Sequence, residues 1–245
     1  MSLVHEFENS GNWLFRRRSW LPVILIVAGI IVMYLTNRQA ILFDIRNELI
    51  FLGVSLFGET IRIFTVGYAP RNTSGRNTIA GQIADDLNVT GIYSLLRHPL
   101  YLGNFFMWLG PVLFLRSFLF IVFFVLVYWL YYERIMFAEE QFLRRKFGEI
   151  YDKWSDTVRA IIPGFKRYIK PALRFSIRNV LKREYNSFVN VFVIFTILDL
   201  FRNYFLSERI YLTPMWIYIS VPAGVIWLVI RTIHKRTQWL EVEGR

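Results

Sequence analysis

The 245-residue chain contains no cysteine, and its three histidines, His5, His98 and His234, lie far apart in the sequence. The lack of cysteine excludes disulfides, thiolate catalysis and cysteine-ligated zinc or iron–sulfur sites. Such scattered histidines do not indicate a metal centre, and we expect no metal. The sequence also lacks a glycine-rich strand-to-helix turn of the kind that binds dinucleotides.

Polar residues are too few to cover the surface of a water-soluble fold. Hydrophobic residues make up 55% of the chain, aromatic residues make up 18%, and the mean hydropathy is +0.37. The net charge of +11 comes from basic blocks between apolar runs, which fits loops that rest on an anionic phospholipid bilayer. Because no groove-binding motif accompanies this charge, we expect no nucleic acid partner. The sequence therefore predicts an integral membrane protein.

Six apolar segments are candidates to cross the hydrocarbon core of a bilayer, which is about 30 Å thick. They are Trp20 to Thr36, Ile50 to Val66, Leu100 to Leu115, Phe118 to Tyr132, Phe188 to Leu206 and Met215 to Ile230. Only "RSF" separates the third from the fourth, which predicts a tight helical hairpin. No small-residue cleavage site follows the first segment, which indicates a signal anchor. The predicted fold class is all-α, a polytopic membrane helical bundle with about six transmembrane helices.

Basic residues are distributed unevenly between the two sides of this predicted bundle. Most of the 29 Lys and Arg residues fall before the first segment, between the second and third, between the fourth and fifth, or after the sixth. Loops rich in Lys and Arg remain in the cytoplasm. We therefore expect a multi-pass protein of the inner (cytoplasmic) membrane with both termini in the cytoplasm.

The stretch "GIYSLLRHPLYLG", residues 91–103, places Arg97, His98 and Pro99 immediately before the third apolar segment. Proline suits the first position of a helix, so Arg97 and His98 are expected at the positive helix start, where an anionic ligand would bind well. The same residues could instead anchor the segment at the lipid headgroups. The local sequence leaves these two interpretations equally open.

A second polar stretch, "YYERIMFAEEQFLRRKFGEIYDKWSDTVRAIIPGF", covers residues 131–165. Glu133 and Glu140 are two turns apart and share a helix face, and Glu140 can pair with Arg144 at i, i+4. A solvated, salt-bridged helix is one interpretation. The other is a pocket, because Glu133 lies at the end of an apolar segment, where an unpaired carboxylate is costly.

Two apolar segments contain charged pairs at i, i+3 spacing, Glu59 with Arg62 and Asp199 with Arg202. Ionisable residues inside a membrane are candidates for function, but each pair could also neutralise itself while holding helices together. We weight function more for Glu59 and Arg62, which lie toward the predicted cytoplasmic half.

The two polar stretches together resemble the isoprenylcysteine carboxyl methyltransferase and phospholipid methyltransferase superfamily. The shared pattern is Gly-x-Tyr, three residues, Arg-His-Pro-x-Tyr-x-Gly, and later Glu-Glu, Leu, Phe-Gly, Tyr and Ile-Pro at set spacings. The resemblance covers roughly residues 88–165. The matching positions are Gly91, Tyr93, Arg97, His98, Pro99, Tyr101, Gly103, Glu139, Glu140, Leu143, Phe147, Gly148, Tyr151, Ile162 and Pro163.

The resemblance implies an all-helical membrane methyltransferase that binds S-adenosylmethionine with these two blocks on the cytoplasmic side. It implies that His98 and Tyr101 line the cofactor cleft, that Glu140 accepts the amino group of the methionine moiety and that Tyr151 closes over it. Tyr93, Gly103 and Glu139 are the remaining cofactor-binding candidates. We expect three regions: N-terminal transmembrane helices (1–66), a methyltransferase core (67–165) and a basic linker with a C-terminal transmembrane helix pair (166–245).

Methyl transfer from a sulfonium requires the positioning of two partners more than a protein nucleophile. A carboxylate or phosphate acceptor would need a cation, for which Arg62, Arg97 and Arg159 are candidates, whereas an amine acceptor would need a base such as Glu59 or Glu133. The surplus of basic residues favours a membrane lipid substrate with an anionic headgroup, such as a lipid A-type phosphate. A prenylcysteine carboxylate and a phosphatidylethanolamine amine remain open.

Two other classes of function also remain open. A sterol-type reductase resembles this family on the cofactor side but uses NADPH, and a transporter or scaffold would need Arg-His-Pro only as an anchor. The polar loop "APRNTSGRNT", residues 69–78, could contact a headgroup or could be a plain turn. The basic stretch "IKPALRFSIRNVLKRE", residues 169–184, could lie on the headgroups or be a plain linker.

Overall fold

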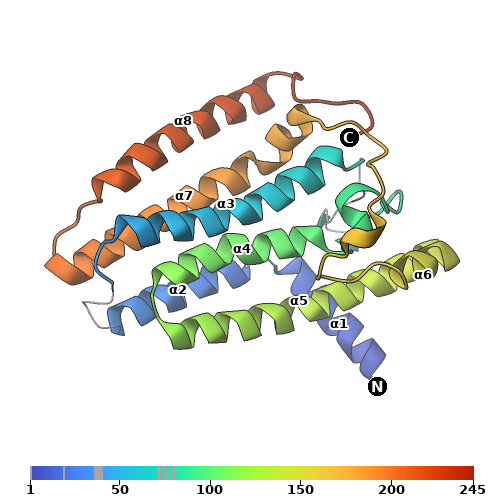
Figure 1. Cartoon of the computed structure of the whole chain (residues 1–245), viewed down its shortest axis with the longest axis horizontal. Coiled ribbons are helices and arrows are strands. Elements are labelled where there is room, and N and C mark those ends of the chain that lie inside the picture. Colours follow the sequence, from blue (N-terminus) through green and yellow to red (C-terminus); the bar gives the residue numbers. More distant parts are fainter. Residues whose placement is uncertain (1, 19, 36–40, 71–72, 74–76, 79–80) are drawn as a thin grey trace.

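The computed structural model describes residues 2–18, 20–35, 41–70, 73, 77–78 and 81–245. Six long helices form one bundle, with two further helices at one end (Figure 1). The helices are α1 (Leu3–Arg16), α2 (Trp20–Leu35), α3 (Ile45–Tyr68), α4 (Pro99–Phe114), α5 (Phe118–Phe147), α6 (Glu149–Ser155), α7 (Ile177–Ser207) and α8 (Pro214–Arg236). Short elements complete the described part: the antiparallel strands β1 (Asn77–Thr78) and β2 (Gly81–Gln82), and the 3-10 turns η1 (Gly91–Ser94) and η2 (Phe165–Arg167).

The all-α membrane class is confirmed. Helices α3, α5, α7 and α8 are long and apolar enough to cross a bilayer, while α2 and α4 are apolar but have only 16 residues each. The six long helices correspond to the six predicted segments, although α5 ends at Phe147 and not at Tyr132, and α7 begins at Ile177 and not at Phe188. The last residue of the first predicted segment, Thr36, lies outside the described residues.

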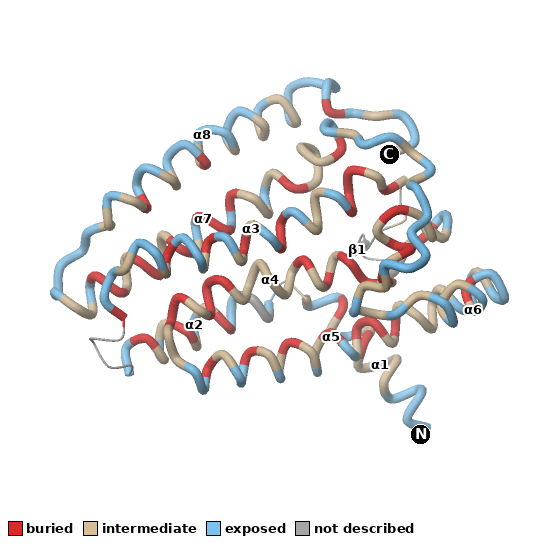
Figure 2. Tube along the Cα trace, in the orientation of Figure 1, coloured by how far each residue is buried: buried red, intermediate tan, exposed pale blue. Residues whose placement is uncertain are grey.

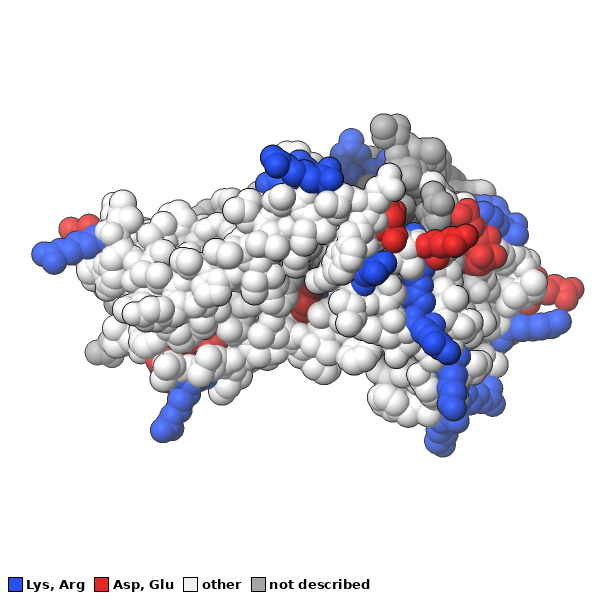
Figure 3. All heavy atoms as spheres, turned by 90° about the horizontal axis from the view of Figure 1, so that it is seen from above, with Lys and Arg blue, Asp and Glu red and all other residues white. Residues whose placement is uncertain are grey.

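The two termini lie at the same end of the bundle (Figure 1). Successive long helices run in opposite directions, so an even number of them returns the chain to the end where it started. Figure 3 shows charged side chains gathered at that end and a few at the opposite tip, with a body between them that is almost free of charge. This distribution is typical of a protein whose middle lies in lipid.

Small residues allow α3 and α4 to pack closely. A Cβ atom at Gly58 would overlap the carbonyl oxygen of Gly103, and one at Gly110 would overlap the hydroxyl of Ser55. That hydroxyl donates a hydrogen bond to the carbonyl of Met107 at 2.8 Å. Small residues serve this purpose in membrane bundles, where close van der Waals packing replaces the hydrophobic effect between helices.

The predicted hairpin is confirmed as α4 and α5, which are joined by residues 115–117. Aromatic side chains fill the space between its arms. Phe105 contacts the rings of Phe124, Tyr128 and Trp129, and the hydroxyl of Tyr128 donates to the carbonyl of Tyr101 at 2.7 Å. These contacts fix the height of α4 against α5, and therefore the relative position of the two motif blocks.

Helix α1 was not predicted, although Leu3, Phe7, Leu14 and Phe15 mark one face at helical spacing. It crosses α5 so closely that a Cβ at Gly11 would overlap the carbonyl oxygen of Arg134. The hydroxyl of Tyr131 on α5 donates to the carbonyl of Leu14 at 3.1 Å. These contacts bring the end of α1 to the motif end of the bundle.

Helix α8 lies at the edge of the bundle against α7 and is mostly exposed (Figures 1 and 2). Its exposed side chains are large and apolar, among them Tyr218, Val221, Val225 and Leu228. An apolar face of this kind suits contact with lipid chains.

A buried ionic cluster, called the closed cluster below, ties α3, α7 and α8 together. It consists of Glu48, Asp199 and Arg202, each at most 2% exposed. Arg202 pairs with both carboxylates, and the indole of Trp216 donates to Glu48 at 3.1 Å. Asp199 also accepts the backbone N–H of Thr213, which precedes α8, at 2.7 Å. The predicted pairing of Asp199 with Arg202 is therefore confirmed, in a role that holds helices together.

Candidate active site

The first motif block forms a tight turn that leads into α4. Gly91 has a φ of +61°, which favours glycine, and it starts η1. The hydroxyl of Ser94 donates to the carbonyl of Gly91 at 2.6 Å, and Pro99 is the first residue of α4. Arg97 and His98 are therefore held at the start of the helix, as predicted.

The end of the second block runs alongside the first. The N–H of Arg97 donates to the carbonyl of Arg159 at 2.9 Å, the N–H of His98 to that of Ala160 at 3.0 Å, and the N–H of Gly164 to that of Leu95 at 2.9 Å. Gly148, at a φ of +54°, separates α5 from α6 and lets the chain turn back toward the first block. The two blocks therefore form one unit.

Arg97 holds this unit together with its side chain. Its Nε atom donates to Glu140 at 2.9 Å, and its Nη1 atom donates to the carbonyls of Ser155 and Val158, both at 2.7 Å. The guanidinium thus connects α4, α5 and the segment after α6. The pairing of Glu140 with Arg144 that the spacing allowed is absent, because Arg144 pairs with Asp152.

His98 lies between two carboxylates. Its Nε2 atom is 2.9 Å from Glu140 and its Nδ1 atom is 3.6 Å from Glu139, which also accepts the hydroxyl of Tyr101 at 2.9 Å. Burial alone would lower the pKa of His98, but the hydrogen bonds and negative charges of Glu139 and Glu140 outweigh it, so the pKa is raised. Arg97, His98, Glu139 and Glu140 are called the motif cluster below.

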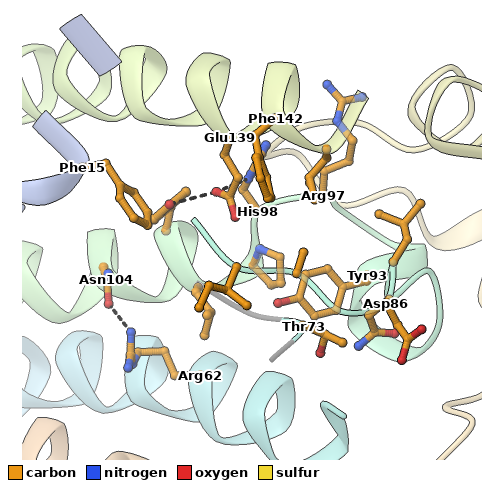
Figure 4. A pocket seen from close by; sticks show the side chains of 18 of the residues that line it. Phe15, Arg62, Thr73, Asp86, Tyr93, Arg97, His98, Asn104, Glu139 and Phe142 are labelled. Carbon is orange, nitrogen blue, oxygen red and sulfur yellow. Dashed lines mark hydrogen bonds and ion pairs between the residues drawn. The ribbon is translucent and has the colours of Figure 1, made fainter. Parts of the chain in front are cut away.

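A cavity of about 380 Å³ opens beside the motif cluster (Figure 4). This volume lies in the range of about 300 to 1,000 Å³ that small-molecule sites occupy. Residues from α1, α3, α4, α5, α6, α7 and the loop before η1 line it. They include Phe15, Arg18, Arg62, Asp86, Tyr93, Arg97, His98, Tyr101, Asn104, Glu139, Phe142, Tyr151, Trp154, Glu184 and Ser187.

Tyr151 on α6 is buried at the wall of this cavity. Within the described part of the chain, its hydroxyl has no hydrogen-bond partner. Burial, followed by the negative charge of Glu140, raises the pKa of Tyr151, so the hydroxyl keeps its proton. A buried hydroxyl without a partner is costly, and its place at a cavity wall suggests that a ligand supplies the missing hydrogen bond.

The inner end of the cavity lies between α3, α4 and α7. Arg62 makes a bidentate pair with Glu184: Nε donates to Oε2 at 2.9 Å, and Nη2 donates to Oε1 at 3.0 Å and lies 2.7 Å from Oε2. Its Nη1 atom donates to Asn104 at 2.6 Å, and its Nη2 atom lies 3.5 Å from the hydroxyl of Ser187. In Figure 4, Arg62 and Asn104 face each other on the side away from Tyr93 and Asp86.

The structure gathers most of the predicted site residues around this cavity. Seven of them line it: Arg62, Tyr93, Arg97, His98, Tyr101, Glu139 and Tyr151. Glu140 does not line it but holds Arg97 and His98, and Gly103 packs against the side chain of Arg62.

Glu59 and Arg159 are not among the cavity-lining residues. Glu59 is buried, and neither of its oxygens has a hydrogen-bond partner in the described residues. Arg159 is exposed at the surface, and it contributes a backbone carbonyl to the motif unit.

Several lining residues were not predicted. Asn104 could have been recognised as a polar side chain inside an apolar segment, on the same face as Tyr101. Glu184 and Ser187 gave no local signal, because they lie at the end of a basic stretch and just after it, and their partner Arg62 is 122 and 125 residues earlier. In the polar loop 69–78, positions 71–72 and 74–76 lie outside the described residues. Among the described residues, no group of three or more His, Asp or Glu could hold a metal ion.

A comparison with known families and proteins identifies the chain's relatives. The family model described as phospholipid methyltransferase matches residues 49–150, from α3 into α6. A probable protein-S-isoprenylcysteine O-methyltransferase of Oryza sativa subsp. indica is 32% identical over 131 residues, which cover 51% of this chain and 68% of the relative. The chain belongs to the isoprenylcysteine carboxyl methyltransferase and phospholipid methyltransferase superfamily.

Other members of this superfamily match shorter segments. The protein-S-isoprenylcysteine O-methyltransferase of Schizosaccharomyces pombe is 40% identical over 81 residues, which cover 32% of this chain and 34% of the relative. The enzyme of that name from Saccharomyces cerevisiae is 36% identical over 74 residues, which cover 30% and 31%. No solved structure matches the chain.

These comparisons confirm the superfamily that the motif predicted, and the chain is a membrane methyltransferase. The relatives are named for methylation of a prenylcysteine oxygen. They therefore favour the prenylcysteine alternative over the lipid A-type phosphate to which the basic charge pointed.

Proposed function

We propose that this protein transfers the methyl group of S-adenosylmethionine to the carboxylate of a membrane-embedded amphiphile, with a prenylated cysteine as the model acceptor. The observation that carries the proposal is the single cavity that joins the motif cluster to Arg62. One end of this cavity consists of family motif residues, and the other reaches into the apolar bundle. A water-soluble donor and a lipid-soluble acceptor can therefore meet in it.

The residues around the cavity fit S-adenosylmethionine. This donor supplies a methyl group on a sulfonium and carries an amino group and a carboxylate. Glu139 and Asp86 offer negative charge to its cationic groups, and Arg18 offers positive charge to its carboxylate. The aromatic faces of Tyr93 and Phe142 suit a cationic ligand.

In this proposal, Glu139 and the hydroxyl of Tyr151 contact the donor directly, because both line the cavity. Glu140 does not line the cavity and acts indirectly, because it holds Arg97 and His98 in place. The role that the resemblance implied for Glu140 toward the amino group passes to Glu139 for this reason.

A carboxylate acceptor needs no general base, since it is already ionised at neutral pH. It needs a cation that orients it, and Arg62 is the candidate at the inner end of the cavity. Arg97 is already engaged by Glu140 and two carbonyls, and Arg159 is exposed. The names of the relatives in rice and yeasts support the same choice of acceptor.

The proposal places the motif end of the bundle in the cytoplasm, where the donor is dissolved. The gathering of basic side chains at that end supports this orientation (Figure 3). Both termini would then be cytoplasmic, in the inner membrane.

The test uses the purified full chain in lipid nanodiscs with methyl-labelled S-adenosylmethionine. N-acetyl-S-farnesyl-cysteine and a mixed phospholipid fraction that contains lipid A serve as acceptors in separate reactions. We expect label in the farnesyl-cysteine probe, released by mild base as expected of a carboxyl methyl ester. Label that resists mild base and is found only in the phospholipid fraction would contradict the carboxylate and favour an amine or phosphate acceptor.

A further inference from the structure

Helix α7 contributes one wall of the cavity from outside the matched part of the chain. The family model ends at residue 150, whereas α7 begins at Ile177. Glu184 and Ser187 on α7 nevertheless line the cavity and contact Arg62 on α3. The acceptor end of the site therefore contains residues that the family motif does not include.

These contacts lie inside the bundle and not at its rim. Arg62 precedes the end of α3 by six residues, and Asn104 follows the start of α4 by five. At 1.5 Å per residue, both lie about 8 to 9 Å inward from the helix ends. Glu184 lies about 10 Å along α7 by the same measure. A headgroup whose chain remains in the bilayer would meet Arg62 at this depth.

The hydrogen bonds that Arg62 makes within the described residues leave one of its N–H donors free. A guanidinium has five N–H donors. Glu184 receives the Nε donor and an Nη2 donor, Asn104 receives one Nη1 donor, and Ser187 lies 3.5 Å from Nη2. One Nη1 donor has no hydrogen-bond partner among the described residues. Arg62 is 16% exposed and Glu184 is 5% exposed, and both line the cavity, so Arg62 is the more accessible member of the pair.

A second carboxylate competes for this guanidinium. Glu59 is one turn before Arg62 on α3, is buried, and does not line the cavity. Without Glu184, the nearest compensation for the charge of Arg62 would be Glu59, which has no hydrogen-bond partner of its own in the described part of the chain. The guanidinium would then turn away from the cavity, because an unpaired charge in an apolar bundle is costly.

We propose that Glu184 is a positioning residue that holds the open Nη1 edge of Arg62 toward the carboxylate of the acceptor. The inference rests on the proposed function and extends it, because it assigns orientation of the acceptor to α7. Asn104 fixes the same guanidinium from α4, so Glu184 and Asn104 together set the orientation of Arg62. The acceptor class that fits this arrangement is an anion with at least one unhindered oxygen.

The test compares the steady-state kinetics of full-length variants in nanodiscs, with N-acetyl-S-farnesyl-cysteine as acceptor. Glu184→Gln keeps the shape of the side chain and removes its charge. A shift of about 1 Å in a group that orients a substrate can reduce the rate by up to about 100-fold. We expect the acceptor KM to rise at least about 10-fold while the KM for S-adenosylmethionine changes less than about 2-fold.

The matched control is Lys182→Gln on the same helix, which breaks an ion pair with Glu241 away from the cavity. Both KM values should stay at the wild-type level in this variant. If Glu184→Gln does not fold, Glu184→Asp keeps the charge and shortens the side chain by one methylene, and the acceptor KM should still rise several-fold. The double variant Arg62→Met/Glu184→Met should be no worse than Arg62→Met alone, since the two residues act through one contact.

An acceptor KM at the wild-type level in the Glu184 variants would overturn the inference, as would an equal rise in both KM values. Neither result would affect the proposed function, which wild-type activity tests separately. A wild-type protein that binds S-adenosylmethionine but does not methylate the probe would contradict the proposed carboxylate acceptor instead.

Discussion

Two groups of buried charges in this bundle have similar composition and different surroundings. The closed cluster combines two carboxylates with one arginine, and the motif cluster combines two carboxylates with an arginine and a histidine. In the closed cluster, all four carboxylate oxygens accept hydrogen bonds, and its three residues are absent from the cavity lining. The motif cluster borders a cavity of about 380 Å³, at which the hydroxyl of Tyr151 has no hydrogen-bond partner among the described residues.

The difference shows that a cluster of buried charges does not by itself indicate a ligand-binding site. The carboxylates of Glu48 and Asp199 are fully hydrogen-bonded and, with Arg202, hold α3, α7 and α8 together, although the Nε atom of Arg202 has no partner among the described residues. In the sequence alone, these charged residues stand out from their apolar surroundings as much as the charged residues of the motif do. The site is distinguished by space for a ligand. Unsatisfied buried atoms alone do not mark it, because the described residues include others away from the cavity, on Glu59 and Arg202.

The largest effect should come from breaking the closed cluster. Asp199→Ala leaves Arg202 with one carboxylate and removes the acceptor for the N–H before α8. Loss of one partner from a buried ion pair typically costs about 3 to 5 kcal/mol. We expect the free energy of unfolding to fall by this amount in equilibrium denaturation, while affinity for S-adenosylmethionine at low temperature is unchanged.

The matched change in the motif cluster is Glu139→Gln, which should have the opposite profile. The free energy of unfolding should change much less than in Asp199→Ala, and the affinity for S-adenosylmethionine should fall. If Asp199→Ala weakens cofactor binding as much as Glu139→Gln does, the separation of the two clusters is wrong.

A smaller effect should come from moving α1 away from the site. Gly11→Leu cannot fit against the carbonyl of Arg134, so α1 must shift and carry Phe15 from the cavity wall. Affinity for S-adenosylmethionine should fall about 3- to 10-fold, which corresponds to loss of part of one buried aromatic contact. The control is Gly224→Leu on α8, where a Cβ meets no atom of the described part of the chain within 4 Å. Calorimetric titration of both variants checks the prediction, and equal affinities would count against a role for α1.

The smallest effect concerns pH. The raised pKa of His98 means that its charged form stabilises the fold, so this contribution is fully present below the ordinary value of 6.5 and is lost as pH rises through the folded-state pKa. The thermal midpoint should therefore decline by a few degrees from pH 6 to pH 9 more in wild type than in His98→Gln. Equal slopes in the two proteins would show that His98 is not charged in the folded state.

Patterns local to the sequence predicted much of the fold. The apolar segments located all six long helices, because about 20 apolar residues in a row have few alternatives to a membrane helix. The end of α5, at Phe147 and not Tyr132, and the start of α7 were both missed. The short connection after Leu115 predicted the hairpin. The start of α7 was missed because residues 177–187 are too polar to read as membrane, although they continue the helix toward the motif end.

Contacts between distant segments were harder to predict. Spacing suggested Glu59 for Arg62 and Arg144 for Glu140, but the partners are Glu184 in the first case and Arg97 with His98 in the second. The spacing of residues along a helix predicts which side chains share a face of that helix. It does not predict which other helix packs against that face. The motif resemblance named most of the cavity-lining residues of its own blocks, whereas those from α1 and α7 emerged only when the helices were packed together.

Equilibrium binding of S-adenosylmethionine to the purified chain in nanodiscs tests the central claim most directly. Titration calorimetry on wild type, Glu139→Gln and Asp199→Asn at low temperature, where all three are folded, makes the comparison. The account predicts one binding site in wild type and in Asp199→Asn, and affinity at least about 10-fold weaker in Glu139→Gln, because a hydrogen bond to a charged group contributes about 1.5 to 3 kcal/mol. Wild-type affinity in Glu139→Gln, or an equal loss in both variants, would contradict it.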